Sequence, residues 1–242
     1  MTTRSLSGAA FATLLTIALM MGANHVAARL AFNNGVDVAT AVAFRSLITA
    51  AVLAVLLLVQ GVRVRLTARH RRALPIIGLL VGIQSLCLYA AVARLPVALA
   101  LLAFNTYPLW TALWARLLYQ HRPERAVLIA MPVLLFGLAL ALDVLGAASG
   151  LGVADQWGRI GVGVAFALTA AATFGVALVL TQHEAGDLDG RVRTLSTLSL
   201  VGVLALAGVA TQGGFHLPNA APGWWGLAAL TFLYGTAFTV MF

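Results

Sequence analysis

The chain has 242 residues, of which 62% are hydrophobic and only 9% are charged. Soluble domains carry about 25% charged residues, so this composition excludes an ordinary water-soluble fold and indicates an all-α, polytopic helical membrane protein. The formal net charge of +8 comes from arginines without any lysine, and the one cysteine, Cys87, excludes an internal disulfide.

Apolar windows separated by glycine, proline or charged residues predict eight membrane-spanning helices. The first apolar run follows Arg4, as in a secretory signal, but it continues through Asn24 and His25 to Phe32 and is longer than a usual signal core. We interpret it as a first span, with a cleaved signal as the alternative. The predicted spans cover residues 9–31, 38–60, 74–93, 96–118, 126–145, 159–182, 194–212 and 224–242.

Polar side chains occur inside the first two predicted spans. His25, beside Asn24, can gain or lose a proton near physiological pH, which favours a proton-sensitive substrate or coupling site. The alternative is a neutral histidine that is hydrogen-bonded to a neighbouring helix. Arg45, inside the second span, must find a partner or water. We expect either an ion pair with Asp37 or Asp143 that fixes helix packing, or a contact with an anionic group of a substrate.

Arginines concentrate in the short connections on one side of the predicted spans, at residues 61–73, 119–125 and 184–193. The positive-inside rule therefore places these connections and the N-terminus in the cytoplasm, in a multi-pass protein of the inner or plasma membrane of the cell. Such arginine runs also resemble a patch for nucleic acid or anionic lipid, but membrane topology accounts for them without nucleic acid.

The fourth predicted span, within residues 95–118, has polar groups at its centre. An uncharged stretch of about 20 residues covers the roughly 30 Å hydrocarbon core, so Asn105, Thr106 and Tyr107 lie near mid-membrane. Polar groups at this depth should face protein or a water-filled cavity, and Pro108 should kink the helix. These features favour a transport pathway. The alternative is that the polar groups cap neighbouring helices.

Further polar and aromatic side chains complete the candidate site. Gln84 lies in the third span, and Trp110 and Trp114 lie one turn apart in the fourth, where they either line a pocket for an organic substrate or only pack. The sequence has no P-loop, GxSxG or HExxH motif and no cluster of metal ligands, so we expect no enzymatic activity, no ATP, and no cofactor or metal. The candidate substrate-binding residues are Asn24, His25, Gln84, Asn105, Tyr107 and Trp110.

The spans before and after residues 146–158, a glycine-rich connection, resemble each other at an offset of about 150 residues. Residues 1–145 hold five predicted spans, and this odd number makes the second half, residues 159–242, enter the membrane from the opposite side. Inverted repeats of this kind are typical of secondary transporters. The second half holds only three spans, so we expect an incomplete second repeat in a truncated chain, with a native eight-helix variant as the alternative.

The run LPVALALLAFNTYPLWTALWARLL is followed by a basic turn and then by AVLIAMPVLLFGLALAL, and the second span contains AVAFRSLITAAVLAVLLL. This arrangement resembles the first half of EamA-domain transporters, which belong to the drug/metabolite transporter superfamily. Pro108 matches the mid-membrane proline of the family's fourth helix, Gly137 the late glycine of its fifth and Arg45 the arginine of its second. The chain departs from the family at Gln120, where an acidic residue is usual.

The resemblance covers residues 9–145 well and residues 159–242 weakly, and it implies a ten-helix transporter that exports small metabolites, amino acids or drugs. Together with the inverted repeat, it makes a secondary transporter working by alternating access our main hypothesis. The alternatives are a truncated, non-transporting membrane protein with a structural or regulatory role, and a membrane-embedded transferase built on the loop of His70. The expected partners are a small-molecule substrate and the lipid bilayer but no nucleic acid, and the oligomeric state stays open, a homodimer included.

Overall fold

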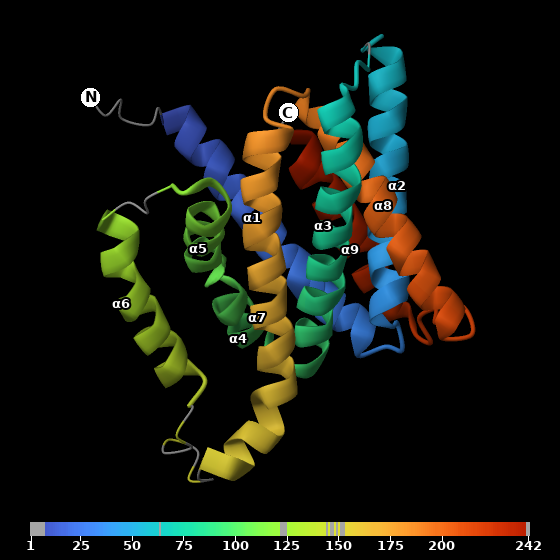
Figure 1. Cartoon of the computed structure of the whole chain (residues 1–242). Helices are drawn as coiled ribbons and strands as arrows, with labels where there is room; N and C mark the ends of the chain where they lie inside the picture. The colour runs from blue at the N-terminus through green and yellow to red at the C-terminus, as the bar shows by residue number, and fades with distance from the viewer. Residues whose placement is uncertain are drawn as a thin grey trace.

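A computed structural model of the chain describes residues 8–62, 64–121, 125–143, 145, 148, 150 and 153–240. Within these residues the regular structure is helical throughout and no strand occurs (Figure 1), which confirms the predicted all-α class. The helices are α1 (Gly8–Phe32), α2 (Val38–Val59), α3 (Ala68–Arg94), α4 (Val97–Phe104), α5 (Tyr107–Tyr119), α6 (Arg125–Ala141), α7 (Val153–Glu184), α8 (Gly190–Thr211) and α9 (Ala221–Val240).

Six segments of the described chain are helical, long and apolar enough to cross a membrane, so the protein is a polytopic helical membrane protein, as predicted. Helices α6 and α9 coincide with two further predicted spans, and the apolar part of α6 is shorter, Ile129–Ala141. Helix α7 begins at Val153, earlier than expected from the sequence. The six segments are Ala10–Phe32, Val38–Val59, Ala68–Arg94, Val97–Tyr119, Asp155–Glu184 and Gly190–Thr211.

The predicted fourth span is interrupted at Asn105 and Thr106, so α4 and α5 are two helices where the sequence predicts one kinked helix. Pro108 has no backbone N–H and cannot donate to the carbonyl oxygen of Phe104, so the helical hydrogen bond across this point is lost. The Thr106 hydroxyl instead donates to the carbonyl oxygen of Ala103 at 2.8 Å. The proline therefore replaces the expected kink with a break.

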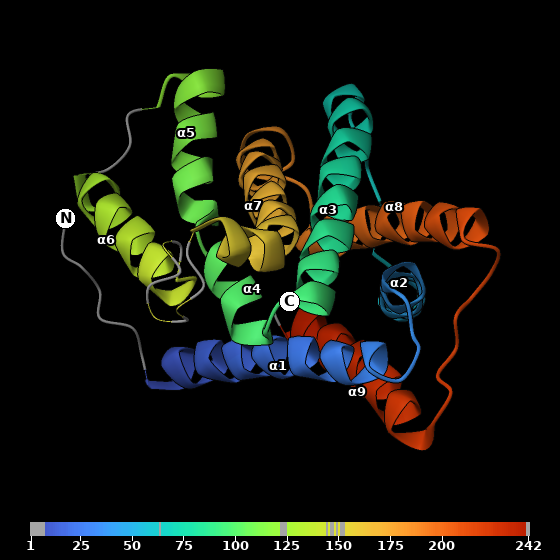
Figure 2. The ribbon, with the colours of Figure 1, turned by 90° about the horizontal axis from the view of Figure 1, so that it is seen from below.

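Helices from the two halves of the chain pack against each other in a reciprocal pattern. Helix α1 lies along α9, α3 lies along α7, and α2 lies along α8 (Figures 1 and 2). Two further pairs, α2 with α9 and α3 with α8, also join the halves. Helices α4 and α5 pack on α7, and α6 lies at the edge of the bundle beside α5. The core is therefore built mainly between the halves.

Glycines let two of these helix pairs approach at backbone distance. A Cβ atom placed on Gly226 of α9 would lie 2.7 Å from the backbone nitrogen of Ala31 in α1. A Cβ atom placed on Gly175 of α7 would lie 2.8 Å from the backbone nitrogen of Thr111 in α5. Both distances are too short for any side chain larger than a hydrogen atom, so these contacts require glycine.

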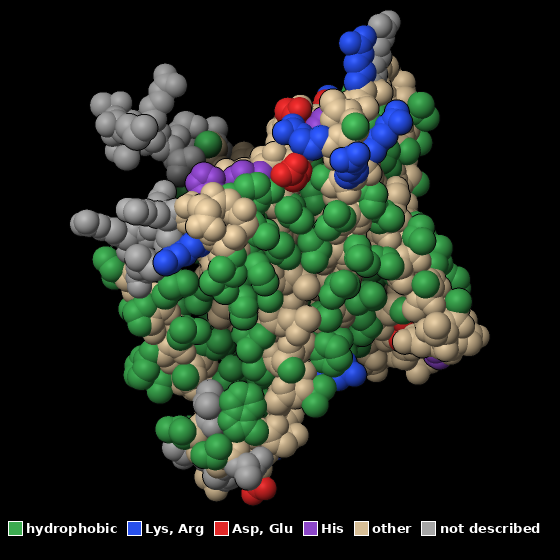
Figure 3. All heavy atoms as spheres, viewed as in Figure 1, with side chains coloured by type: hydrophobic (Ala, Val, Ile, Leu, Met, Phe, Trp, Pro, Cys, Tyr) green, Lys and Arg blue, Asp and Glu red, His purple; other side chains and the backbone are tan. Residues whose placement is uncertain are grey.

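The two ends of the bundle differ in charge. Arginine side chains gather at the upper end in Figure 3, where the α2–α3 and α7–α8 connections lie. We call this the arginine-rich end; it includes Arg69, Arg71, Arg72 and Arg191. The opposite end contains the α1–α2 and α8–α9 connections. Between the ends, hydrophobic side chains cover the outer surface (Figure 3), as contact with lipid requires.

Candidate functional site

A polar cluster lies inside the bundle where α1, α2, α3 and α9 meet. Asn24 is fully buried, and its Nδ2 donates to the hydroxyl oxygen of Tyr89 at 3.0 Å. The ring of His25 lies 5.5 Å from the ring of Tyr89, measured between centroids. The structure therefore brings together Asn24 and His25, two of the predicted substrate-binding residues, with Tyr89 of α3.

Arg45 joins this cluster from α2 and is only 3% exposed. Its guanidinium carbon lies 4.5 Å from the ring centroid of Tyr89 and 4.1 Å from that of Tyr234 in α9. A guanidinium held over aromatic faces recovers part of the electrostatic stabilisation that it loses on leaving water. The charge of Arg45 is therefore held mainly by two tyrosines.

The expected ion pair of Arg45 with Asp37 or Asp143 is not formed. Asp37 caps the start of α2, where its side chain accepts the backbone N–H of Thr40 at 2.6 Å, and it also pairs with His216. Asp143 accepts the backbone N–H of Ala148 at 3.0 Å. Asp37 lies two helical turns before Arg45, so each side chain finds a nearer partner. Among the described residues, no carboxylate lies within salt-bridge distance of Arg45.

Four buried polar atoms around this cluster lack a hydrogen-bond partner within the described part of the chain. They belong to side chains of α1 and α2, and leaving such an atom unpaired costs about 1–3 kcal/mol. Native proteins keep unpaired buried groups mainly where water, an ion or a ligand meets them. The four atoms are His25 Nδ1, Arg45 Nε, Ser46 Oγ and Thr49 Oγ1.

An aromatic cluster lies on the other side of the bundle, between α4, α5 and α7. The ring centroid of Phe174 is 5.2 Å from that of Tyr107 and 5.5 Å from that of Phe104. Trp110 lies one turn after Tyr107, and its Cβ would be 2.8 Å from a Cβ placed on Gly175. Tyr107 and Trp110 therefore belong to the contact with α7, apart from Asn24 and His25.

The other two predicted substrate-binding residues lie in neither cluster. Gln84 is buried in α3 and accepts a hydrogen bond from the hydroxyl of Ser85 at 3.3 Å. Asn105 follows the end of α4, and its side chain is exposed. The six residues thus occupy several places in the fold.

A cavity of about 380 Å³ lies between the two clusters, and α1, α3, α7, α8 and α9 contribute to its lining. Tyr234 from the polar cluster and Phe174 from the aromatic cluster both line it. Met21 supplies the α1 wall, and Thr181 and Arg193 lie in the parts of α7 and α8 nearest the arginine-rich end. We call this space the five-helix cavity.

The residues that join the five-helix cavity to the clusters were not predicted from the sequence. Tyr234 and Phe174 are polar or aromatic residues inside apolar helices, a signal of the kind that identified Tyr107. Arg193 was assigned only to membrane topology. Their meeting depends on contacts between helices far apart in the chain, which periodicity along one helix does not predict.

A larger apolar groove of about 500 Å³ lies between α2 and α9. Its walls include Phe44, Trp224 and Phe232, and no charged side chain is among its described lining residues. Such a surface suits lipid chains, and it offers no group that would select a polar substrate.

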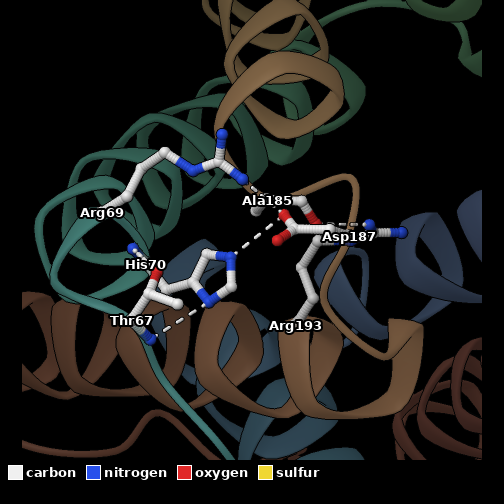
Figure 4. A network of polar contacts seen from close by, with 6 residues as sticks. All are labelled: Thr67, Arg69, His70, Ala185, Asp187 and Arg193. Carbon is white, nitrogen blue, oxygen red and sulfur yellow. Dashed lines mark hydrogen bonds and ion pairs between the residues drawn. The ribbon is translucent and has the colours of Figure 1, made fainter.

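A network of polar contacts lies at the arginine-rich end, beside Arg193 of the cavity lining (Figure 4). His70, at the start of α3, has a side chain only 4% exposed, and its Nε2 lies 3.1 Å from Oδ1 of Asp187 in the α7–α8 connection. Arg69 Nη2 lies 2.7 Å from the same oxygen. The hydrogen bond from His70, more than the charge of Arg69, holds the pKa of Asp187 below its usual value.

The tautomer of His70 follows from its second contact. Thr67 precedes α3, and its backbone N–H donates to His70 Nδ1 at 3.4 Å. The backbone N–H of His70 in turn donates to the Thr67 hydroxyl at 3.3 Å. Because Nδ1 accepts in this capping box, the ring proton lies on Nε2 and is donated to Asp187. In the same view, Arg193 Nη1 donates to the carbonyl oxygen of Ala185 at 3.1 Å.

A second set of contacts at this end joins α5 to α7. The Tyr119 hydroxyl donates to Glu184 Oε1 at 2.7 Å, and the Tyr119 ring stacks on that of His183 with centroids 3.8 Å apart. His121 Nε2 lies 3.1 Å from His183 Nε2. Side chains of α3, α5 and α7 and of the α7–α8 connection therefore meet at the arginine-rich end.

Comparison with known families identifies the first half of the chain. The model of the EamA-like transporter family matches residues 7–142, more than half of the chain, from the start of α1 to the end of α6. The comparison with curated proteins finds no match. The matched region contains Asn24, Arg45 and the α4–α5 break at Pro108. The chain belongs to the EamA-like transporter family of the drug/metabolite transporter superfamily, whose members are membrane transporters rather than enzymes.

Proposed function

We propose that the protein is a secondary transporter that moves small organic molecules across the cell membrane by alternating access. The observation that carries this proposal is the reciprocal packing of the two halves around the five-helix cavity. Two similar bundles that enclose a site between them can expose it to either side by rocking against each other. Small metabolites, amino acids and drugs are the candidate substrates, and export is the proposed direction.

The helix contacts support an inverted repeat of residues 1–145 and 159–242. If α1, α2 and α3 correspond to α7, α8 and α9, a two-fold axis exchanges the pair α1–α9 with the pair α7–α3. The same axis maps α2–α8 onto itself and exchanges α2–α9 with α8–α3. All of these pairs pack against each other in the structure. The contacts are those that two-fold related bundles require.

The polar and aromatic clusters support a substrate site at the five-helix cavity. Asn24 and His25 connect to the cavity through Tyr89, Arg45 and Tyr234, and unpaired buried atoms occur in this cluster. On the other side, Phe174 is both a lining residue and a contact of Tyr107. Gln84, Asn105 and Trp110 remain candidates on the sequence argument alone.

Orientation follows from the arginines. The arginine-rich end is proposed to face the cytoplasm, with the N-terminus on the same side. The ion pair between Arg69 and Asp187 joins the start of α3 to the α7–α8 connection, and such a contact requires both to lie on one side of the membrane. Opening of the cavity to the cytoplasm would then separate the contacts of Asp187.

The proposal is tested with the full chain in proteoliposomes, by counterflow of radiolabelled amino acids, organic acids and organic cations. We expect saturable flux of at least one class. Asn24→Ala and His25→Ala should each lower it about tenfold, the effect expected from removing one polar contact in a buried site. Val26→Ala is the matched control, because Val26 is exposed on the outside of the same helix. Absence of saturable flux for every class would reject the transporter, and flux insensitive to both substitutions would reject the site.

A further inference from the structure

The geometry points to an organic anion as the substrate class of the five-helix cavity, an inference that rests on the proposed function. The described lining of this cavity includes one charged side chain, Arg193, and no carboxylate. Three features support the inference. Arg193 has no carboxylate partner among the described residues, a second arginine, Arg45, is buried behind the cavity wall, and the cavity lining is divided into polar and apolar parts.

Arg193 lines the cavity while half-buried, and its hydrogen bond is to a backbone carbonyl, that of Ala185 (Figure 4). The nearby carboxylates are engaged elsewhere: Asp187 pairs with Arg69 and His70, and Asp189 pairs with Arg191. Within the described chain, no carboxylate lies within 4.0 Å of Arg193. A guanidinium has five N–H donors, so donors remain for an anionic group of a ligand.

A second positive charge lies behind the cavity wall. Tyr234 lines the cavity, and the guanidinium of Arg45 lies over its ring, 4.1 Å from the centroid. Arg45 also lacks a carboxylate partner among the described residues. Two arginines without a described carboxylate partner, one of them buried, give the cavity a positive potential that attracts anions and repels cations.

The rest of the lining sets the form of the anion. Thr194, next to Arg193, and Thr181 supply hydroxyl groups in the same part of the cavity, while Met21 and Phe174 are apolar. A volume of about 380 Å³ is near the lower end of ligand pockets, which begin at about 300 Å³. The fitting ligand has one anionic group near Arg193 and a body of about one aromatic ring. The ammonium of an amino acid or a cationic drug finds no described carboxylate there.

The inference is tested by equilibrium binding to the full chain in lipid nanodiscs, with probes of fixed charge and similar size. We expect radiolabelled benzenesulfonate to bind, with benzyltrimethylammonium and phenylalanine at least about tenfold weaker. Arg193→Gln should weaken benzenesulfonate binding about tenfold or more, whereas Arg193→Lys, which keeps the charge, should lose much less. Arg71→Gln is the matched control, because Arg71 is exposed at the same end of the protein and does not line the cavity.

Several results would overturn the inference: no binding of benzenesulfonate, equal or tighter binding of the cation, or benzenesulfonate binding unchanged in Arg193→Gln. If Arg193→Gln does not fold, the charge preference of the unsubstituted chain decides the question. Saturable counterflow of a cation or a zwitterion without benzenesulfonate binding would reject an anionic substrate but would support the proposed transport function. Absence of counterflow for every class rejects the proposed function itself.

Discussion

The two ends of the bundle are held together by different kinds of contact. At the arginine-rich end, Arg69 and His70 converge on Asp187, and the side chains of the Arg69–Asp187 ion pair are about half exposed. At the opposite end, Arg29 of α1 donates to the backbone carbonyl oxygens of Val92 at 2.7 Å and Leu95 at 3.4 Å.

The opposite end also has an ion pair, between Asp37 and His216, but backbone contacts lie beside it. The backbone N–H of Asn219 donates to the carbonyl oxygen of Asn34 at 3.0 Å, and that of His216 donates to the hydroxyl of Thr40 at 3.1 Å. The contact of α3 with the α7–α8 connection depends on one exposed carboxylate, so it separates more easily than several bonds to backbone groups. The comparison therefore predicts that the arginine-rich end opens first.

The largest expected effect concerns the opposite end. Arg29→Gln removes charged hydrogen bonds to two carbonyl oxygens, which should lower the free energy of unfolding by about 2 kcal/mol and the melting temperature by about 5 °C. Thermal unfolding in detergent measures the change. Arg159→Gln is the control, because Arg159 is exposed in the half of α7 towards the same end. Equal melting temperatures for both variants would show that the hydrogen bonds of Arg29 do not stabilise this end of the bundle.

A smaller effect is expected at the arginine-rich end. Asp187→Asn removes the charge that meets Arg69 and should raise the labelling rate of a cysteine at Thr181, inside the cavity, about fivefold. A membrane-impermeant thiol reagent measures the rate in a Cys87→Ser background. Asp189→Asn is the control, since Asp189 pairs with Arg191 of its own helix start. Faster labelling in both variants would show that Asp187 has no special part in closing this end.

The smallest effect is a dependence on pH. The pKa of Asp187 is lowered in the folded state, first by the hydrogen bond from His70, so its contribution is present above the unfolded value of 3.8. It is lost as the pH falls through the lower folded value. The difference in labelling between the unsubstituted chain and Asp187→Asn should therefore hold at neutral pH and shrink below about pH 4. A difference that disappears already near pH 6 would assign the effect to another group.

The membrane-spanning helices could be predicted because the length and apolarity of a segment suffice to define them. At Asn105 and Thr106 the sequence predicted a disturbance of the helix but not its interruption. The missing N–H of Pro108 is a local property, whereas the packing of neighbouring helices decides whether the helix kinks or ends. The partner of Arg45 could not be predicted. Two tyrosines of α3 and α9 reach its guanidinium, and the sequence does not show which helices stand beside α2.

The same reason limits the prediction of the site. Asn24 and His25 are neighbours in the chain and remain neighbours in the cluster, but Tyr234 reaches them only through the packing of α9 on α1 and α2. In the sequence, Arg193 indicates only membrane topology. It lines the cavity because α8 packs against α3.

The two glycine contacts determine which parts of the protein can move separately. Gly226 brings α9 onto the backbone of α1, and Gly175 brings α7 onto the backbone of α5, with no side chain between them to rearrange. Both contacts join one half of the chain to the other, so we expect them to persist while the halves move. Met21 and Tyr234 line the cavity from the α1–α9 pair and Phe174 from the α5–α7 pair, so the space between them should widen or narrow by rotation of one half against the other about these two contacts.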